Sequence, residues 1–254
     1  MQIDLNSDLG ESFGAWVMGD DAAMLGVVTS ANIACGGHAG DAQTMFATLR
    51  EAAARGVSIG AHPGYADRAG FGRRVIPMHP DEIGRMLAAQ VGALQGVAAL
   101  AGATVGYVKP HGALANLAAD RRDVADAIVR AVAALPGRLA ILAISGTELE
   151  LAARALACPV YSEVFADRGY LPNGRLVPRG QPGAMIDDPE LAADRMIGLL
   201  RSGAMPVVGG APIMLAAHSI CVHGDSPGAL VMARHMRQRL TAEGIELRPF
   251  LARR

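Results

Sequence analysis

The chain has 254 residues, of which 51% are hydrophobic, and a formal net charge of −1. This composition excludes a disordered or highly charged chain, because it supplies enough apolar surface for a sizeable core. The 23 basic and 24 acidic side chains are balanced, and aromatic residues make up only 4% of the chain. Neither a basic surface nor an aromatic stacking surface is therefore expected, and we expect no nucleic-acid partner.

The three cysteines, Cys35, Cys158 and Cys221, include no C-x-x-C pair. This spacing favours a reducing, cytoplasmic setting. The N-terminal residues lack the basic and apolar regions of a secretory signal. Two long uncharged stretches, 86–108 and 202–222, are interrupted by glycine and by glutamine or proline. Neither predicts a membrane span, so we expect no membrane association.

Short β-branched runs alternate with longer amphipathic or alanine-rich runs along the whole chain. The runs predict strands at residues 2–6, 30–34, 57–61, 105–108, 139–144, 160–164, 213–222 and 245–250. Helices are predicted between them, mostly opening with Asp, Thr or Pro as helix starts do, at residues 41–55, 80–101, 120–135, 147–156, 189–201 and 227–243.

This unbroken series of βα units predicts an α/β fold. Seven or eight units favour a single TIM-like (β/α) barrel over a doubly wound sheet, and nothing divides residues 1–254 into two domains. Two long segments, 63–77 and 166–188, are rich in Gly and Arg and lack periodicity. Long loops of this kind are more often functional than structural.

Chemically capable side chains follow the predicted strands at their carboxyl ends. In a parallel barrel all of these ends lie on one face, where active sites are found. The residues concerned are Asp4, Asn6, Asp8, Glu11, Cys35, His38, Asp41, His62, Asp67, Arg68, Lys109, His111, Glu163, Asp167, Arg168, His223 and Asp225. We therefore expect them to surround one pocket.

Four histidines in this set, His38, His62, His111 and His223, are flanked by small residues that leave room for a ligand. Asp8 with His38 and His62 offers a site for a divalent metal that activates water. The chain has no H-E-x-x-H or other tight ligand spacing, and a metal-free hydrogen-bonded network has the same sequence pattern. Both interpretations stay open at this point.

Lys109 is the only lysine among 23 basic residues. Its position in V-K-P-H-G at a strand end favours a functional ammonium group. The sequence contains neither G-x-x-x-x-G-K-[ST] nor G-x-G-x-x-G. If a nucleotide is used, its site is therefore unconventional or belongs to a partner.

Eight ordered motifs are similar to those of the LamB/YcsF family. They are D-L-N-S-D-L-G-E at residues 4–11, N-I-A-C-G-G-H-A-G-D at 32–41, G-A-H-P-G-Y at 60–65, G-F-G-R-R at 70–74, K-P-H-G-A-L at 109–114, E-V-F-A-D-R-G-Y at 163–170, L-V-P-R at 176–179 and I-C-V-H-G-D at 220–225. The resemblance covers nearly the whole chain.

The resemblance implies ATP-dependent cleavage of 5-oxo-L-proline to L-glutamate, within a 5-oxoprolinase that also contains B and C subunits. It also implies a barrel related to the glycoside hydrolase/deacetylase folds, in which an Asp and two histidines bind metal; Asp8, His38 and His62 match by position. ATP is the expected cofactor, bound by this chain or shared with its partners, and a divalent metal is a second candidate.

Phosphorylation of the lactam oxygen would activate the ring carbon, after which the protein supplies a base for water and cationic help for negative charge. For this chemistry we assign a catalytic set of Asp8, His38, His62, Lys109, His111 and Asp225. The expected substrate-binding set is Asn6, Glu11, Arg73, Glu163, Arg168, Arg179 and His223. Two alternatives stay open: a metal-dependent amide deacetylase or amidohydrolase, and a non-catalytic subunit that binds the substrate.

Overall fold

The computed structural model describes residues 1–224 and 228–251. Seven parallel strands in this part of the chain close into a barrel, in the order β1 (Gln2–Leu9), β2 (Ser30–Ala34), β3 (Ser58–His62), β4 (Val105–Val108), β5 (Ala140–Ile144), β6 (Val160–Phe165) and β9 (Ser219–Cys221). Strand β9 closes the barrel because it pairs with both β6 and β1. The predicted TIM-like barrel is confirmed, with seven strands.

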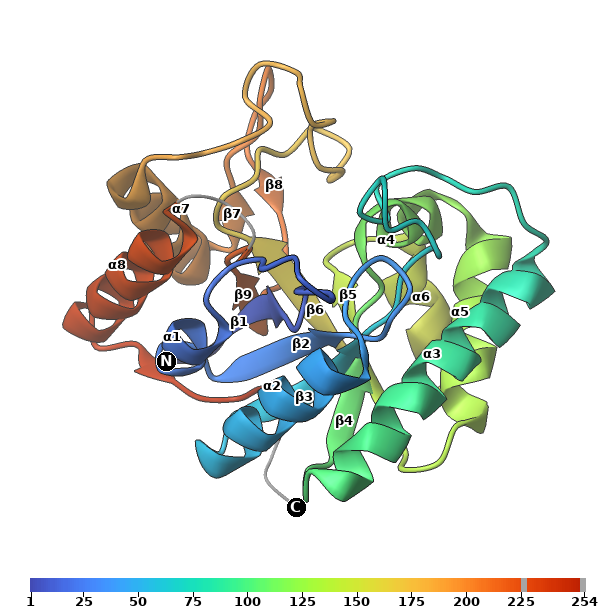
Figure 1. Cartoon of the computed structure of the whole chain (residues 1–254). Helices are drawn as coiled ribbons and strands as arrows, with labels where there is room; N and C mark the ends of the chain where they lie inside the picture. Colours follow the sequence, from blue (N-terminus) through green and yellow to red (C-terminus); the bar gives the residue numbers. More distant parts are fainter. Residues whose placement is uncertain (225–227, 252–254) are drawn as a thin grey trace.

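Helices surround the barrel, and most connect one strand to the next (Figure 1). They are α1 (Asp21–Leu25), α2 (Ala42–Ala54), α3 (Pro80–Leu100), α4 (Gly112–Asp120), α5 (Arg122–Ala134), α6 (Glu148–Ala155), α7 (Pro189–Ser202) and α8 (Ala229–Ala242). Neither α1 nor α4 is predicted from the sequence. Helix α1 is only five residues long, and α4 begins at Gly112, a poor helix former that directly follows the K-P-H motif.

Helix α3 is long and apolar enough to cross a membrane by length and composition. Its buried residues recur at helical spacing, as Ile83, Leu87, Val91, Leu94 and Ala98. This stripe belongs to the core, and α3 lies against α5 on the outside of the barrel. Packing within the fold therefore accounts for the apolar residues of this stripe.

The chain between β6 and β9 leaves the barrel and returns to it (Figure 1). It contains α7 and a small antiparallel pair, β7 (Ala204–Met205) with β8 (Ile213–Met214). The prediction of one strand over residues 213–222 is wrong, because its two ends belong to different sheets. The last predicted strand, 245–250, is confined to β10 (Glu246–Leu247), which pairs with β1 at the edge of the barrel.

The barrel interior is polar, whereas the apolar core lies between the strands and the helices. Side chains alternate along β1: Ile3, Leu5 and Leu9 belong to the apolar core. The intervening Asp4, Asn6 and Asp8 are buried and hydrogen-bond to polar groups of other strands. Because of this alternation, Asp4, Asn6 and Asp8 lie one after another inside the barrel, and Asp8 is nearest to its carboxyl end.

Candidate functional site

A cavity of about 650 Å³ lies at the carboxyl end of the barrel. Nine residues of the expected site line it: Asp8, His62, Arg73, Lys109, His111, Glu163, Arg168, Arg179 and His223. Three others, Asn6, Glu11 and His38, are buried behind its wall. Asp225 lies outside the described residues. The structure therefore brings together residues from six separate segments of the sequence.

Lys109 lies at the centre of the site and is buried at the end of β4. Its Nζ atom is 2.8 Å from Asp8 Oδ1 and 2.8 Å from Glu163 Oε1. Burial by itself would lower the pKa of Lys109, but the nearby carboxyl groups of Asp8 and Glu163 outweigh burial and hold the pKa well above its usual value. The structure therefore fixes a permanent positive charge in the cavity wall.

The two carboxyl partners of Lys109 have opposite environments. Burial would raise the pKa of Asp8, but His62 and Lys109 hold it well below its usual value. Asn32 also donates to Asp8 Oδ1, at 2.8 Å. Burial raises the pKa of Glu163, and Lys109 only partly opposes this rise. Asp8 is thus a strongly held anion, whereas Glu163 takes up a proton more readily.

Asn6 belongs to the hydrogen-bond network under the cavity. Its Oδ1 atom accepts from Asn32 at 2.7 Å and from Lys109 at 3.4 Å, and its Nδ2 atom donates to Ser219 at 2.6 Å. Asn32 is not among the expected site residues. It lies inside a predicted strand, so the pattern of polar residues after strand ends does not indicate it.

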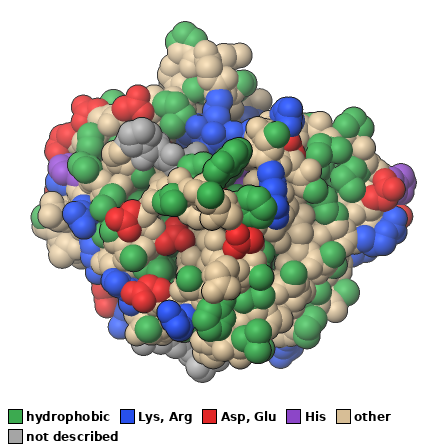
Figure 2. Space-filling view, viewed as in Figure 1, with side chains coloured by type: hydrophobic (Ala, Val, Ile, Leu, Met, Phe, Trp, Pro, Cys, Tyr) green, Lys and Arg blue, Asp and Glu red, His purple; other side chains and the backbone are tan. Residues whose placement is uncertain are grey.

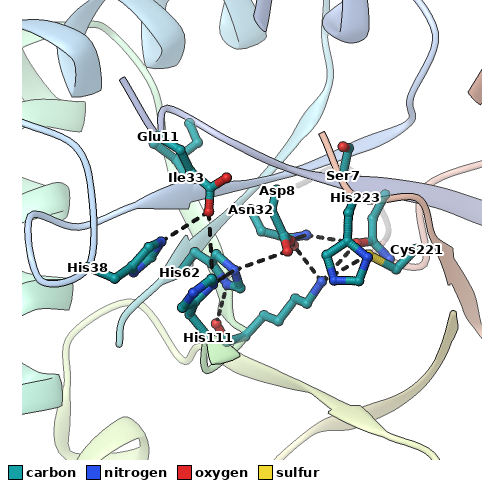
Figure 3. Close-up of polar contacts among 12 residues, drawn as sticks. Ser7, Asp8, Glu11, Asn32, Ile33, His38, His62, His111, Cys221 and His223 are labelled. Atoms are coloured by element: carbon teal, nitrogen blue, oxygen red, sulfur yellow. Dashed lines mark hydrogen bonds and ion pairs between the residues drawn. The ribbon is translucent and has the colours of Figure 1, made fainter. Parts of the chain in front are cut away.

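Three histidines and one glutamate form a second cluster beside Asp8, the His–Glu cluster: Glu11, His38, His62 and His111. One donor atom from each lies within 4.8 Å of the other three. Figure 3 shows these side chains pointing towards one another beside Asp8. Burial lowers the pKa values of His38 and His111, and neighbouring histidines lower them further. Both rings are therefore neutral.

This geometry changes the set of candidate metal ligands. The sequence predicts that His38 and His62 act with Asp8, and all three lie in this region. The group of four that the structure brings together contains Glu11 and His111 in place of Asp8. Asp8 instead forms a separate group with Cys221 and His223. The spacing of E-S-F-G and K-P-H-G in the sequence gives no sign that these residues meet.

His223, which also lines the cavity, forms an ion pair with Asp167. Its Nδ1 atom is 2.7 Å from Asp167 Oδ2, and its ring stacks on Phe165. Burial would lower the pKa of His223, but Asp167 reverses this effect and raises it. Asp167 follows its strand in the sequence but is not part of the expected catalytic or binding sets, and it holds His223 in place.

The three arginines of the expected site that line the cavity differ in burial. Arg168 is buried, donates to the backbone oxygens of Ala184 and Val177, and thereby holds the long 166–188 loop together. Burial and the nearby Arg179 lower the pKa of Arg168 to about 10. Arg73 and Arg179 are exposed and line the cavity. Basic side chains also gather near the upper centre of the face in Figure 2.

The thiols near the site are not activated. Burial raises the pKa of Cys35 to about 12 and that of Cys221 well above its usual value. Lys109 donates to Cys221 Sγ at 3.2 Å. A nucleophilic cysteine needs a lowered pKa, so both residues serve packing and positioning.

Comparison with known proteins places this chain among close relatives. The chain is 51% identical over 252 residues to the 5-oxoprolinase A subunit numbered 3 from Pseudomonas syringae pv. tomato, covering 99% of this chain and 98% of that protein. It is 53% identical over 251 residues to the 5-oxoprolinase A subunit of Paracidovorax citrulli, covering 98% and 100%.

A crystal structure gives the same result for the fold. The lactam utilization protein from Thermus thermophilus is 40% identical, and it superposes with a TM-score of 0.92 over 98% of this chain and 99% of that one. The sequence also matches the LamB/YcsF family over residues 3–254. From the motifs, the barrel and these matches together, we conclude that the chain belongs to the LamB/YcsF family.

Proposed function

We propose that this chain is the A subunit of an ATP-hydrolysing 5-oxoprolinase. Its cavity takes part in opening 5-oxo-L-proline to L-glutamate, in a complex with B and C subunits. The names of the full-length relatives support the assignment. The observation that carries it is Lys109, a buried cation held between Asp8 and Glu163 at the wall of the cavity.

The cavity suits a small anionic substrate. Its volume of about 650 Å³ is in the range of small-molecule sites, and a single five-membered ring fills only part of it. Leu142, Leu149 and Phe165 provide apolar lining. Arg73 and Arg179 offer planar guanidinium groups, which match a carboxylate or a phosphate.

The lactam is a resonance-stabilised amide, so its carbon needs activation before water can attack. Transfer of the γ-phosphoryl group of ATP to the ring oxygen forms a new O–P bond and releases ADP. Water then adds to the ring carbon and gives up a proton. The C–N bond breaks with its electron pair going to nitrogen, which takes a proton, and γ-glutamyl phosphate results. A second water releases phosphate and leaves glutamate.

We assign two residues to these steps. Lys109 stabilises the negative charge that develops on oxygen, because its ammonium is fixed before the reaction begins. Glu163 carries the proton, because its raised pKa lies closer to neutrality than that of Asp8. Asp8, a member of the catalytic set expected from the sequence, is strongly held as an anion. Its role is to position Lys109 and His62.

Replacement of Lys109 tests this assignment. In the reconstituted complex, Lys109→Ala should lower oxoproline-dependent glutamate release by about a hundredfold or more, the cost of losing one transition-state contact. Arg85→Ala, an exposed change on α3, is the control and should leave the rate unchanged. Near-normal turnover by folded Lys109→Ala would refute the role.

Removal of Lys109 also leaves two buried carboxyl groups without their cation. Glu163→Gln is therefore a second variant, because it keeps the shape of the side chain but cannot carry a proton. It should slow turnover and remove one ionisation from the pH–rate profile. An unchanged profile would contradict proton transfer by Glu163.

The His–Glu cluster favours a second candidate function, metal-dependent hydrolysis of an amide without ATP. The same assay separates the two, because glutamate release that continues without ATP and stops with a chelator would support the second candidate. Stoichiometric binding of 5-oxoproline, with full turnover after Lys109→Ala, would instead identify a non-catalytic binding subunit.

A further inference from the structure

We infer that Glu11, His38, His62 and His111 form a binding site for one divalent transition-metal ion. The four residues are buried beside Asp8, near the carboxyl ends of the strands. The site does not depend on the proposed function, because the inference uses only the geometry of these four side chains.

The donor atoms are spaced as ligands of one ion. His62 Nε2 is 3.0 Å from His111 Nδ1, and His38 Nε2 is 3.1 Å from Glu11 Oε1. His111 Nδ1 is 3.8 Å from the same Glu11 oxygen. Metal–nitrogen and metal–oxygen bonds of about 2.0–2.2 Å hold neighbouring ligand atoms roughly 3–3.5 Å apart.

The positions of the protons carry the inference. His62 Nδ1 is 2.7 Å from the carbonyl oxygen of Lys109, and His111 Nε2 is 2.8 Å from that of Phe71. A carbonyl oxygen only accepts, so both of these nitrogens carry a hydrogen. If both rings are neutral, His62 Nε2 and His111 Nδ1 are lone pairs that face each other at 3.0 Å, and His62 Nε2 also faces Asp8 Oδ2 at 3.2 Å.

Two facing lone pairs repel unless something positive lies beside them. A divalent ion provides that charge and uses both lone pairs. The hydrogen bonds to Lys109 and Phe71 also match those made by metal-bound histidines, which commonly donate the other ring N–H to a backbone carbonyl. These bonds fix the orientation of both rings.

His38 lies against His111 and would have to tilt out of this stack to share an ion with it, because an imidazole binds a metal in its ring plane. Its ring stacks on His111 with 3.6 Å between centroids and 4° between planes. Its Nδ1 atom is buried and has no hydrogen-bond partner among residues 1–224 and 228–251. Without an ion, His38 Nε2–H donates to Glu11 at 3.1 Å. As a ligand, the ring would instead carry its hydrogen on Nδ1 and present the Nε2 lone pair to the ion.

The competing explanation is an additional proton. If His62 were an imidazolium, its Nε2–H would lie between His111 and Asp8, whose Oδ2 atom is 3.2 Å away. No ion would then be needed. The two explanations differ in metal content and in the protonation of His62, and both can be measured.

Three imidazoles and one carboxylate suit zinc and its first-row neighbours better than magnesium or calcium. A bound ion would supply a Lewis acid beside the wall of the cavity that contains Asp8 and His62. We therefore choose Zn²⁺ as the probe and Co²⁺ as its coloured substitute.

The experiment strips the full-length chain with a chelator and titrates Zn²⁺ by calorimetry, with elemental analysis of the dialysed product. We expect one equivalent of zinc per chain, a Co²⁺ absorption spectrum of low-coordinate N/O ligation, and a higher Tm with metal. Glu11→Gln and His111→Ala should each weaken binding at least tenfold. His235→Ala is the control, because His235 is on α8 and pairs with Glu190.

Histidine ¹⁵N NMR of the unmodified chain needs no variant and separates the two explanations even if a variant fails to fold. Metal binding predicts that each of His62 and His111 carries one N–H and that Zn²⁺ shifts the other nitrogen. A folded chain that binds no Zn²⁺ and shows both nitrogens of His62 protonated would overturn the inference.

Discussion

Asp4 is a buried carboxyl group inside the barrel. It lies on β1, two residues before Asn6 and four before Asp8. Its Oδ1 atom accepts hydrogen bonds from Thr29 and Ser30, each at 2.6 Å, and Oδ2 accepts from Ser219. Burial raises the pKa of Asp4 from 3.8 to about 6, although the three hydroxyl donors oppose the rise. The folded chain therefore holds this proton at a pH where the unfolded chain has lost it.

This difference predicts a pH-dependent stability. Between pH 4 and 6 the folded state binds more protons at Asp4, so the free energy of unfolding falls as the pH rises, by about 3 kcal/mol in total. Asp4→Asn removes this contribution. Urea unfolding at several pH values should show the wild-type stability falling relative to Asp4→Asn across this interval.

The exposed change Asp187→Asn is the control for the loss of one carboxyl group. The difference in free energy of unfolding between Asp187→Asn and the wild type should change much less over this pH interval than the difference for Asp4→Asn. Parallel stability curves for the wild type and Asp4→Asn would show that Asp4 titrates normally in the folded chain.

Strands β2, β3 and β4 are connected by one side chain that crosses the middle strand. Tyr107 on β4 lies over Gly60 on β3, and its hydroxyl donates to Asn32 Oδ1 on β2 at 2.7 Å. A Cβ atom at Gly60 would lie 2.1 Å from the Tyr107 ring. Glycine is therefore required here by close approach, and it permits the contact that orients Asn32 towards Asp8.

Gly60→Ala should destabilise the chain by about 2–3 kcal/mol, because the buried ring of Tyr107 has to move. Gly92→Ala is the matched control. Gly92 is exposed in the middle of α3 with no atom within 4 Å of an added Cβ. This change should stabilise the helix by up to about 1 kcal/mol. Urea unfolding of both variants measures the two effects, and equal stabilities would contradict the crossing contact.

At the scale of the whole molecule, the sequence predicts the order of the barrel strands and the end at which the polar residues gather. Both depend on local patterns: β-branched runs form buried strands, and parallel strands end on one face. Asp8, His62 and Lys109 follow this rule directly. The family motifs make the same residues recognisable.

The remaining features depend on contacts between distant parts of the chain. Residues 213–222 form one apolar run in the sequence. In the structure its first part, β8, pairs with β7, whereas its last part, β9, closes the barrel. No spacing in the sequence shows that Glu11 meets His111, or that Asn32 reaches Asp8. The burial of Arg168 also cannot be predicted from the sequence, because it depends on the loop that folds around its side chain.

The burial of Lys109 has a practical consequence for the chain as a whole. Every amine-reactive ester that attacks lysine side chains has one target here, and that target is only 4% exposed and paired with two carboxylates. We expect the peptide that contains Lys109 to stay unacylated in the native chain and to gain mass as urea unfolds it, in proportion to the unfolded fraction. Rapid acylation of the native chain, at the rate of an exposed lysine, would contradict this burial. Because Lys109 is the only lysine, acylation of its peptide, read apart from acylation of the Met1 amine, reports barrel opening with no engineered probe.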